Sequence, residues 1–486
     1  LNTCYTYLGN MDEQLYCEAM TDNAYTKQPN DATQNIGNGS YSTADPYVKK
    51  VWDGRYTGIR MCNELLENID RVPDLDPELK KRYIGEAKVL RAYNYYELYT
   101  KFGDVPYTTK VLSIKESMSI ARTAKATVIA NVLADLDEVI NGNYLPTSYD
   151  ADNKGRITRW AAMAIKAKIY LFEGNWTQVK NITSTIMTEG GFKLFGSYAG
   201  LFEIANEYNS EVILDAQYRP TSREHQMMYV FLPPTLGGYS QLSPLQELVD
   251  SYIMLDGKTI KETGTSFDES HPYANRDPRL KATVMYTGNS YTLADGTEVV
   301  INCEKGEGKD GYGVGSDCSA TGYYIKKYWD NTYRATLYSG LNPILIRYAD
   351  ILLMNAEALA ELGELDKTAW DATIKPIRDR AGFTLASALE FPEGASKDKL
   401  IEIVRNERRS ELALEGHRHK DIIRWRIADN VLNGWCHGLK TNDVVGTDDG
   451  YVRVENRTFN ANKHYLWPIP QAERDLNGNL EQNPNW

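Results

Sequence analysis

Apolar residues follow a helical period near both ends of the chain. Leu79, Tyr83, Ala87 and Leu90 recur every three or four residues, which places their side chains on one face of a helix. The period stops at Gly103, a residue type that commonly ends helices. The pattern therefore predicts a long amphipathic helix in this region.

Two later stretches repeat a helix-turn-helix arrangement. In one of them the first helix ends at Gly174 and the second begins at Trp176. Ala167 lies seven residues before Gly174, and Ala356 lies seven residues before Gly363. A small residue at this position lets two helices approach closely. The order of small residues, aromatic residues and glycine in the first pair is typical of a tetratricopeptide repeat.

We therefore predict helical hairpins at about 47–103, 124–189 and 345–417, stacked into a short solenoid. The expected fold class is mainly α, with a tetratricopeptide-like scaffold of helical hairpins that carries a large insertion of loops and short strands. The expected segments, packed as one unit, are N-terminal helical repeats at 1–190, an irregular ligand-binding insertion at 191–344, and C-terminal helical repeats with a tail at 345–486.

The middle of the chain differs from both ends in its residue composition and in its pattern of apolar residues. Between about 190 and 344 it is rich in Gly, Pro, Asn and Tyr, and the helical period is lost. Short alternating runs at Glu211–Leu214 and Thr297–Ile301 predict small strand pairs. Because long irregular segments on rigid scaffolds often carry binding sites, we expect the function to lie here.

Charge and composition narrow the function classes. The 54 basic and 66 acidic residues give a net charge of −12, the wrong sign for binding nucleic acid. The chain has 34 Tyr but only 10 Phe, and because a tyrosine hydroxyl needs a polar partner, we expect many of these rings to be partly solvated. No stretch approaches the ~18 uninterrupted apolar residues that a membrane-spanning helix needs.

Catalytic and metal-binding signals are weak. His417 and His419 lie two residues apart, so a helix would point them in different directions, and no HExxH motif accompanies them. No nucleophile elbow or phosphate-binding loop stands in a strand-to-helix context. We predict no catalytic residue, no metal-ligating residue and no cofactor. The Asp-rich loops leave calcium binding open, and no EF-hand spacing locates a site for it. A nearby charge cluster is expected to be structural, with pairing between residues one helical turn apart; it consists of Arg405, Glu407, Arg408, Arg409, Glu411 and Glu415.

The six cysteines include no CxxC motif. Cys303 and Cys318 bracket a glycine-rich loop, where a disulfide would restrict the unfolded chain. Two buried or free thiols are the alternative.

Aromatic residues in the irregular segments are the remaining candidates for a site. Sugar rings have apolar C–H faces edged by hydroxyls. Tyr and Trp rings can stack on these faces, and polar side chains beside them can form hydrogen bonds with the hydroxyls. The alternative for each ring is simple packing. The predicted glycan-binding residues are Asn38, Tyr41, Tyr239, Tyr291, Tyr312, Trp329, Tyr333 and Arg334. Five tryptophans are instead expected to pack in the helical scaffold: Trp52, Trp160, Trp176, Trp370 and Trp425.

The C-terminal run Tyr465–Pro484, YLWPIPQAERDLNGNLEQNP, closely resembles the ending of the SusD/RagB family of Bacteroidetes outer-membrane nutrient-binding lipoproteins. Four further segments agree in order with this family: 85–106, Asn275–Leu280, 346–358 and 407–425. Together these segments span nearly the whole chain.

The resemblance implies a non-enzymatic protein on the extracellular face of the outer membrane. Such a protein binds oligosaccharides or polysaccharides and delivers them to a SusC-like TonB-dependent transporter. It also implies a lipid anchor on an N-terminal cysteine; no apolar signal precedes Cys4, so the anchor is expected upstream of this sequence. The resemblance does not identify the glycan. The alternatives are a glycoside hydrolase on a helical framework and a peptide-binding tetratricopeptide adaptor.

Overall fold

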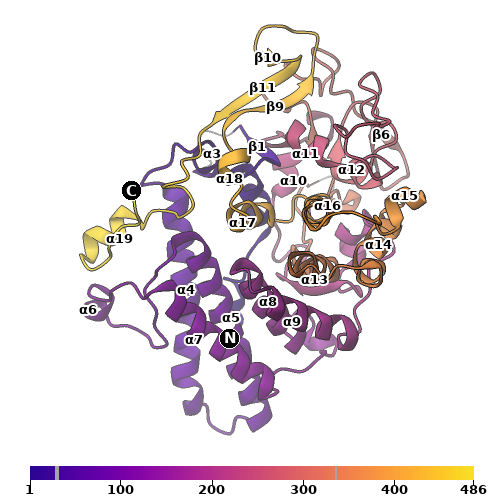
Figure 1. The fold of residues 1–486 in the computed structure, drawn as a ribbon. Helices are drawn as coiled ribbons and strands as arrows, with labels where there is room; N and C mark the ends of the chain where they lie inside the picture. The colour runs from indigo at the N-terminus through magenta and orange to yellow at the C-terminus, as the bar shows by residue number, and fades with distance from the viewer. Residues whose placement is uncertain (28–31, 334–335) are drawn as a thin grey trace.

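The N-terminal half of the protein is a series of antiparallel helices. The computed structural model describes residues 1–27, 32–333 and 336–486. Each long helix packs against the next one in the series (Figure 1). These helices are α4 (Pro46–Asn68), α5 (Pro77–Phe102), α7 (Lys125–Asn141), α8 (Arg159–Phe172) and α9 (Trp176–Glu189).

The series continues with C-terminal helices. Helix α9 packs directly against α13 (Tyr348–Leu362), although a long segment separates them in sequence. Helix α13 in turn packs against α14 (Lys367–Ala381) and α16 (Lys397–Glu411). Figure 1 shows α8, α9 and α13 side by side. The mainly helical scaffold is therefore continuous across the insertion, as the sequence predicted.

Local chemistry explains the helix boundaries. Asp45 caps α4, where its side chain accepts hydrogen bonds from two backbone N–H groups, and Pro46 occupies the first turn. Gly363 ends α13 in the left-handed region, with φ = 74°, which glycine adopts without strain. Ala167 and Ala356 are fully buried, which confirms the predicted close approach of the helices.

The segment between α9 and α13 contains only short elements. The predicted strand pairs are confirmed, with small shifts at their ends. Strand β2 (Val212–Asp215) pairs with β8 (Ile344–Arg347), β4 (Val284–Met285) with β7 (Tyr324–Ile325), and β5 (Ser290–Thr292) with β6 (Glu298–Val300). Strand β3 (Leu242–Pro244) pairs with β1 (Ala24–Thr26) from the N-terminal region. The short helices are α10 (Met227–Phe231), α11 (Gln246–Ser251) and α12 (Pro278–Thr283).

After α16 the chain forms α17 (Arg418–Arg424), α18 (Ala428–Val431) and a hairpin that the sequence did not predict. Its strands are β9 (Gly434–Lys440), β10 (Thr447–Asp448) and β11 (Tyr451–Arg457), and it lies above the insertion in Figure 1. The tail beyond the hairpin returns to α5 and includes α19 (Gln471–Leu476). There the Trp467 N–H donates to the Lys101 carbonyl at 2.7 Å, and the Asn483 amide donates to the Phe102 carbonyl at 2.8 Å. The C-terminal run Tyr465–Pro484 is thus hydrogen-bonded to the end of helix α5.

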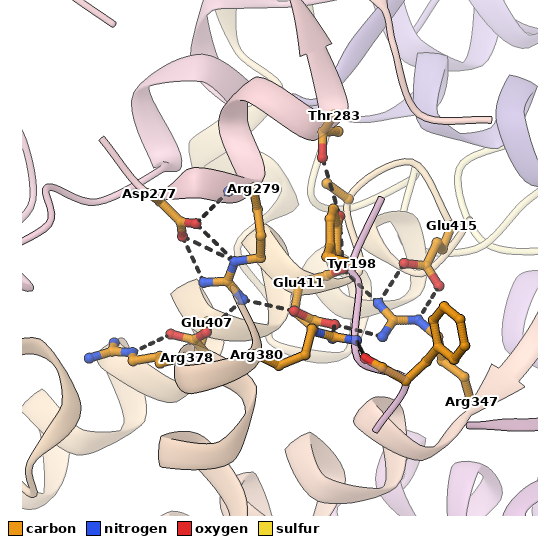
Figure 2. Close-up of polar contacts among 12 residues, drawn as sticks. Tyr198, Asp277, Arg279, Thr283, Arg347, Arg378, Arg380, Glu407, Glu411 and Glu415 are labelled. Atoms are coloured by element: carbon orange, nitrogen blue, oxygen red, sulfur yellow. Dashed lines mark hydrogen bonds and ion pairs between the residues drawn. The ribbon is translucent and has the colours of Figure 1, made fainter. Parts of the chain in front are cut away.

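A network of buried ion pairs joins the insertion to the C-terminal helices (Figure 2). Five cations face five carboxylates, so the formal charges cancel (5 − 5 = 0): Arg279, Lys327, Arg347, Arg378 and Arg380 against Glu211, Asp277, Glu407, Glu411 and Glu415. The Arg347 guanidinium alone contacts three of these acids, among them Glu211 at 2.7 Å and Glu415 at 2.7 Å.

The charge cluster on α16 is structural, but the predicted pairing between its own members is wrong. Its residues pair with other elements instead. Glu407 contacts Arg279 of α12 and Arg378 of α14, and Arg408 contacts Asp350 of α13 at 2.6 Å. The physical reason is burial: a charged side chain on a buried helix face needs partners from the elements that cover that face.

Most of the tryptophans that were expected to pack in the scaffold do so. Trp52, Trp160, Trp370 and Trp425 are buried, and Trp176 is half-buried. All six cysteines, each in a described segment, are free thiols. Cys303 and Cys318 are therefore two buried thiols rather than a disulfide. Within the described residues, no helix is both long and apolar enough to cross a membrane.

Candidate functional site

Two tyrosine rings are stacked on the surface of the insertion. Helix α10 buries Met227, Met228 and Phe231 in the core, which leaves Tyr229 at the edge of the helix. The ring of Tyr239 stacks on that of Tyr229, with centroids 5.8 Å apart and planes inclined by 15°. Tyr239 is 47% exposed, so one broad aromatic face meets solvent.

A tight turn before Tyr239 brings the two rings together. Gly237 has φ = 85°, and a Cβ on Gly238 would lie 2.1 Å from the Leu232 carbonyl oxygen, so neither position accepts a side chain easily. The chain then turns back, and the Tyr239 N–H donates to the Tyr229 carbonyl at 2.8 Å. The backbone thus fixes the stack before any ligand is present.

A third ring joins the stack from the end of the insertion. The backbones of His225 and Ser339 exchange two hydrogen bonds of 2.9 Å, which place Tyr338 beside α10. The Tyr338 ring meets that of Tyr229 edge to face, at 6.3 Å and 89°. Tyr338 is 38% exposed, and its hydroxyl accepts a hydrogen bond from the Gln226 amide. We call Tyr229, Tyr239 and Tyr338 the tyrosine platform.

Further polar and aromatic side chains lie in the segment that precedes α10. The Arg223 guanidinium lies 4.8 Å from the centre of the Tyr218 ring, which meets His225 edge to face at 5.3 Å. Burial lowers the pKa of His225 to about 4, so this imidazole is neutral near pH 7. The exposed rings of Tyr239 and Tyr338, together with the Gln226 amide, suit a ligand with flat C–H faces and hydroxyl edges.

The structure does not gather the predicted site residues into one place. Of the predicted residues whose side chains the structure describes, only Tyr239 belongs to the platform. The expectation that Tyr41 and Tyr291 turn outward is wrong, because both rings are buried. Tyr41 packs against His464 and Trp486 of the tail, and the Tyr291 hydroxyl donates to the Ile325 carbonyl at 2.7 Å.

Other predicted residues are partly exposed but separate. Asn38 donates to Glu455 of the hairpin at 3.3 Å. Tyr312 lies in the glycine-rich loop, where its N–H donates to the Cys303 carbonyl. Trp329 packs on Tyr291 at 5.2 Å and donates its indole N–H to the Thr292 carbonyl.

Two predicted residues lie at the limits of the described chain. Tyr333 ends a short 3₁₀ helix whose side chains are not all described, and Arg334 falls outside the described residues.

Sequence reasoning missed Tyr229, Tyr338 and Gln226. The apolar run Met227–Phe231 inside a polar, irregular segment was a usable signal, because a run of this kind anchors the chain to the core. The paired glycines before Tyr239 were a second signal, since they mark a tight turn. Nothing in the sequence spacing pointed to Tyr338.

Two other polar regions contain residue types found in catalytic or metal sites. Each charged side chain of the ion-pair network is buried and has at least one ion-pair partner, which suits structure better than reaction with a substrate. His417 and His419 line one cavity of about 110 Å³, and burial beside Lys168 and Lys101, respectively, lowers the pKa of each imidazole to about 3. Within the part of the chain that the structure describes, no three His, Cys, Asp or Glu residues cluster to hold a metal ion.

Comparison with protein families agrees with this architecture. Residues 201–486, more than half of the chain, match the model described as SusD family. Residues 4–171 match a second SusD-like model, described as starch-binding associating with outer membrane. This match supports an association of the protein with the outer membrane.

Individual relatives are similar over nearly the whole chain. SusD-like protein P25 of Formosa agariphila is 28% identical over 455 residues, which cover 87% of this chain and 80% of the relative. A SusD-like carbohydrate binding protein of Bacteroides fragilis superposes with a TM-score of 0.86 at 28% identity, covering 99% of this chain and 98% of that one.

A structure described as a laminarin binding SusD-like protein shares the fold, with a TM-score of 0.73 at 24% identity and coverage of 100% and 99%. These relatives are named as binding proteins rather than enzymes. The helical scaffold, the irregular insertion and the family match together show that the chain belongs to the SusD family.

Proposed function

We propose that this protein binds glycans at the cell surface through the tyrosine platform. The observation that carries the proposal is the pair of exposed rings, Tyr239 and Tyr338, held in place by backbone hydrogen bonds around α10. A preorganised aromatic surface costs little conformational entropy when a ligand binds. Two relatives described as carbohydrate and laminarin binding proteins support the same ligand class.

The proposed role is capture without catalysis. The protein holds oligosaccharide or polysaccharide chains on the extracellular face of the outer membrane and passes them to a SusC-like TonB-dependent transporter. A lipid anchor upstream of this sequence would tether it. The family description, associating with outer membrane, supports this location.

Affinity electrophoresis against a polysaccharide panel tests glycan binding. The wild-type protein should be retarded by at least one neutral glycan, and Tyr239→Ala should weaken that retardation about tenfold, because the exposed stacking face is lost. Tyr208→Ala is the matched control, since Tyr208 is also exposed, at 41%, but lies outside the platform.

Equal loss of binding in both variants, or none in Tyr239→Ala, would contradict the platform. Release of reducing sugar by the purified protein would contradict the non-enzymatic role.

The transporter role has its own test. Interfaces of permanent complexes commonly bury more than about 2,000 Å², so the complex should survive gentle solubilisation. We expect the protein to co-purify with a large β-barrel from native outer membranes. Recovery as a free monomer would count against delivery to a transporter.

A further inference from the structure

A second aromatic site lies in a groove between the insertion and the C-terminal hairpin. The groove has a volume of about 1,010 Å³, within the size range of ligand sites. Segments 267–276 and 286–288, the loop 303–307, and strands β9 and β11 contribute its walls. None of the three platform residues lines it. We call it the hairpin groove.

One wall of the hairpin groove is a pair of stacked tyrosines. The rings of Tyr273 and Tyr286 lie parallel, with centroids 4.0 Å apart and planes inclined by 17°. On the hairpin, Tyr451 also lines the groove, and the Lys440 ammonium lies 5.3 Å from the centre of its ring. Aromatic side chains from both the insertion and the hairpin therefore border the same space.

The groove floor is a chain of hydrogen bonds that ends at a carboxylate. The hydroxyls of Tyr273 and Tyr323 lie 3.2 Å apart, and the Tyr323 hydroxyl donates to the Gln246 amide oxygen at 2.6 Å. The amide nitrogen of Gln246 donates to one oxygen of Asp250 at 2.7 Å. Among the residues that the structure describes, no side chain or backbone group forms a hydrogen bond with the second carboxylate oxygen of Asp250 or with the hydroxyls of Tyr286 and Tyr451. These groups are available to a ligand that carries hydroxyls.

The hairpin groove carries more acidic than basic side chains. Its lysines are already paired: Lys440 with Glu269, and Lys305 with Asp443. The Arg276 guanidinium donates to the backbone carbonyls of residues 249, 252 and 272. Three of the acids lining the groove, all within described segments, make no ion pair: Asp250, Glu304 and Glu307. Because these three carboxylates outnumber the Arg276 guanidinium, which also makes no ion pair with any described residue, the charge that remains in the groove is negative.

We propose that the hairpin groove is a second carbohydrate site, which binds a chain of neutral sugars and rejects glycans bearing uronate or sulfate groups. This inference rests on the proposed glycan-binding function and adds to it a second site and a charge selectivity. Stacked tyrosines supply faces for the sugar rings, and Asp250 and the tyrosine hydroxyls supply hydrogen-bond partners. Two sites on one chain would hold a long polysaccharide more tightly than either site alone.

Calorimetric titration with defined oligosaccharides tests the second site. The neutral probes are maltoheptaose, laminarihexaose, xylohexaose and mannohexaose, and the acidic probe is hexagalacturonate. At least one neutral probe should bind wild-type protein with two oligosaccharides per chain. Tyr286→Ala and Tyr239→Ala should each reduce this to one, and the double variant should bind none.

The outcomes separate the two proposals. One site in the wild type that Tyr239→Ala removes would overturn the groove and leave the proposed function intact. Failure of every neutral probe to bind would overturn both proposals. Two-site binding of hexagalacturonate would overturn the charge selectivity.

A second variant tests the hairpin groove without relying on the stability of Tyr286→Ala. Glu304 and Glu307 are exposed at the rim, so substituting both with lysine should leave the fold intact. If the negative field excludes anions, the Glu304→Lys, Glu307→Lys variant should bind hexagalacturonate at least about tenfold more tightly than wild type. Unchanged affinity would contradict the groove.

Discussion

Glu411 lies among three guanidiniums in the ion-pair network. Its carboxylate contacts Arg279 at 2.9 Å and Arg347 at 2.6 Å, and it also pairs with Arg380. Burial alone would raise the pKa of this carboxyl, but the surrounding guanidiniums hold it well below its usual range. Removing the charge leaves buried cations without their partner. We therefore expect Glu411→Gln to lower the free energy of unfolding by about 3–5 kcal/mol, measured by urea denaturation at pH 7.

Glu390→Gln is the matched control for Glu411→Gln. Glu390 also contacts two cations, Lys367 and Lys375, but on the exposed surface. Its loss should leave the free energy of unfolding nearly unchanged, because solvent screens exposed ion pairs. Similar values for the two variants would show that burial does not govern the strength of these pairs.

The lowered pKa of Glu411 makes the free energy of unfolding depend on pH. The folded pKa of Glu411 lies below its unfolded value of about 4.3, so its stabilising effect is present above that pH and is lost as the pH falls. The difference in unfolding free energy between wild type and Glu411→Gln should therefore shrink between pH 5 and pH 3. Urea titrations at several pH values measure this difference, and a constant gap would contradict the assignment.

Helices α9 and α13 meet through a buried amide. The Asn355 side chain on α13 donates to the hydroxyls of Thr183 at 2.9 Å and Ser184 at 3.1 Å on α9. This contact joins the N-terminal helices to the C-terminal helices, which the insertion separates in sequence. Asn355→Ala removes the buried donor and should lower the free energy of unfolding by about 1–3 kcal/mol in urea titrations. Thr188→Ala is the control on α9, because Thr188 is exposed and bonds only within its own helix, so it should change stability by less than about 0.5 kcal/mol.

Helical elements were predictable because their signals are local. The period of apolar residues and the terminal glycines depend on neighbours in sequence, so the hairpins that contain Ala167 and Ala356 followed directly. Which ring in an irregular segment meets solvent depends on contacts distant in sequence. Tyr291 is buried against Ile325, while Tyr239 is exposed because a glycine turn folds it onto α10.

The difference between local signals and contacts distant in sequence also explains why the ion pairs of α16 were predicted wrongly. Residue spacing along the helix favoured pairing within it, but Glu407 and Arg408 face elements from other parts of the chain. The hairpin groove could not be predicted from local sequence patterns either, because Tyr273 and Tyr451 line one cavity but are far apart in sequence.

At the scale of the whole molecule, charges and tail contacts connect all the segments. The ion-pair network includes Glu211 from the insertion and Glu411 from the C-terminal helices, and Arg347 pairs with both. The C-terminal tail binds α5 of the N-terminal helices through Trp467 and Asn483. Separate unfolding of any one segment would therefore expose unpaired buried charge or strip the tail from α5. We propose that residues 1–190, 191–344 and 345–486 fold as one unit.

One cooperative unfolding transition is the expected result of this arrangement. Differential scanning calorimetry of the wild-type protein should show a single peak, and fluorescence and circular dichroism should report the same midpoint. Arg347→Ala should move the whole peak to lower temperature, because the insertion and the C-terminal helices lose their shared cation together. A variant peak that splits in two, with one part at the wild-type temperature, would show that the segments unfold independently. Since Arg347 also contacts Glu415, Arg347→Lys should recover part of the lost stability by keeping a buried positive charge.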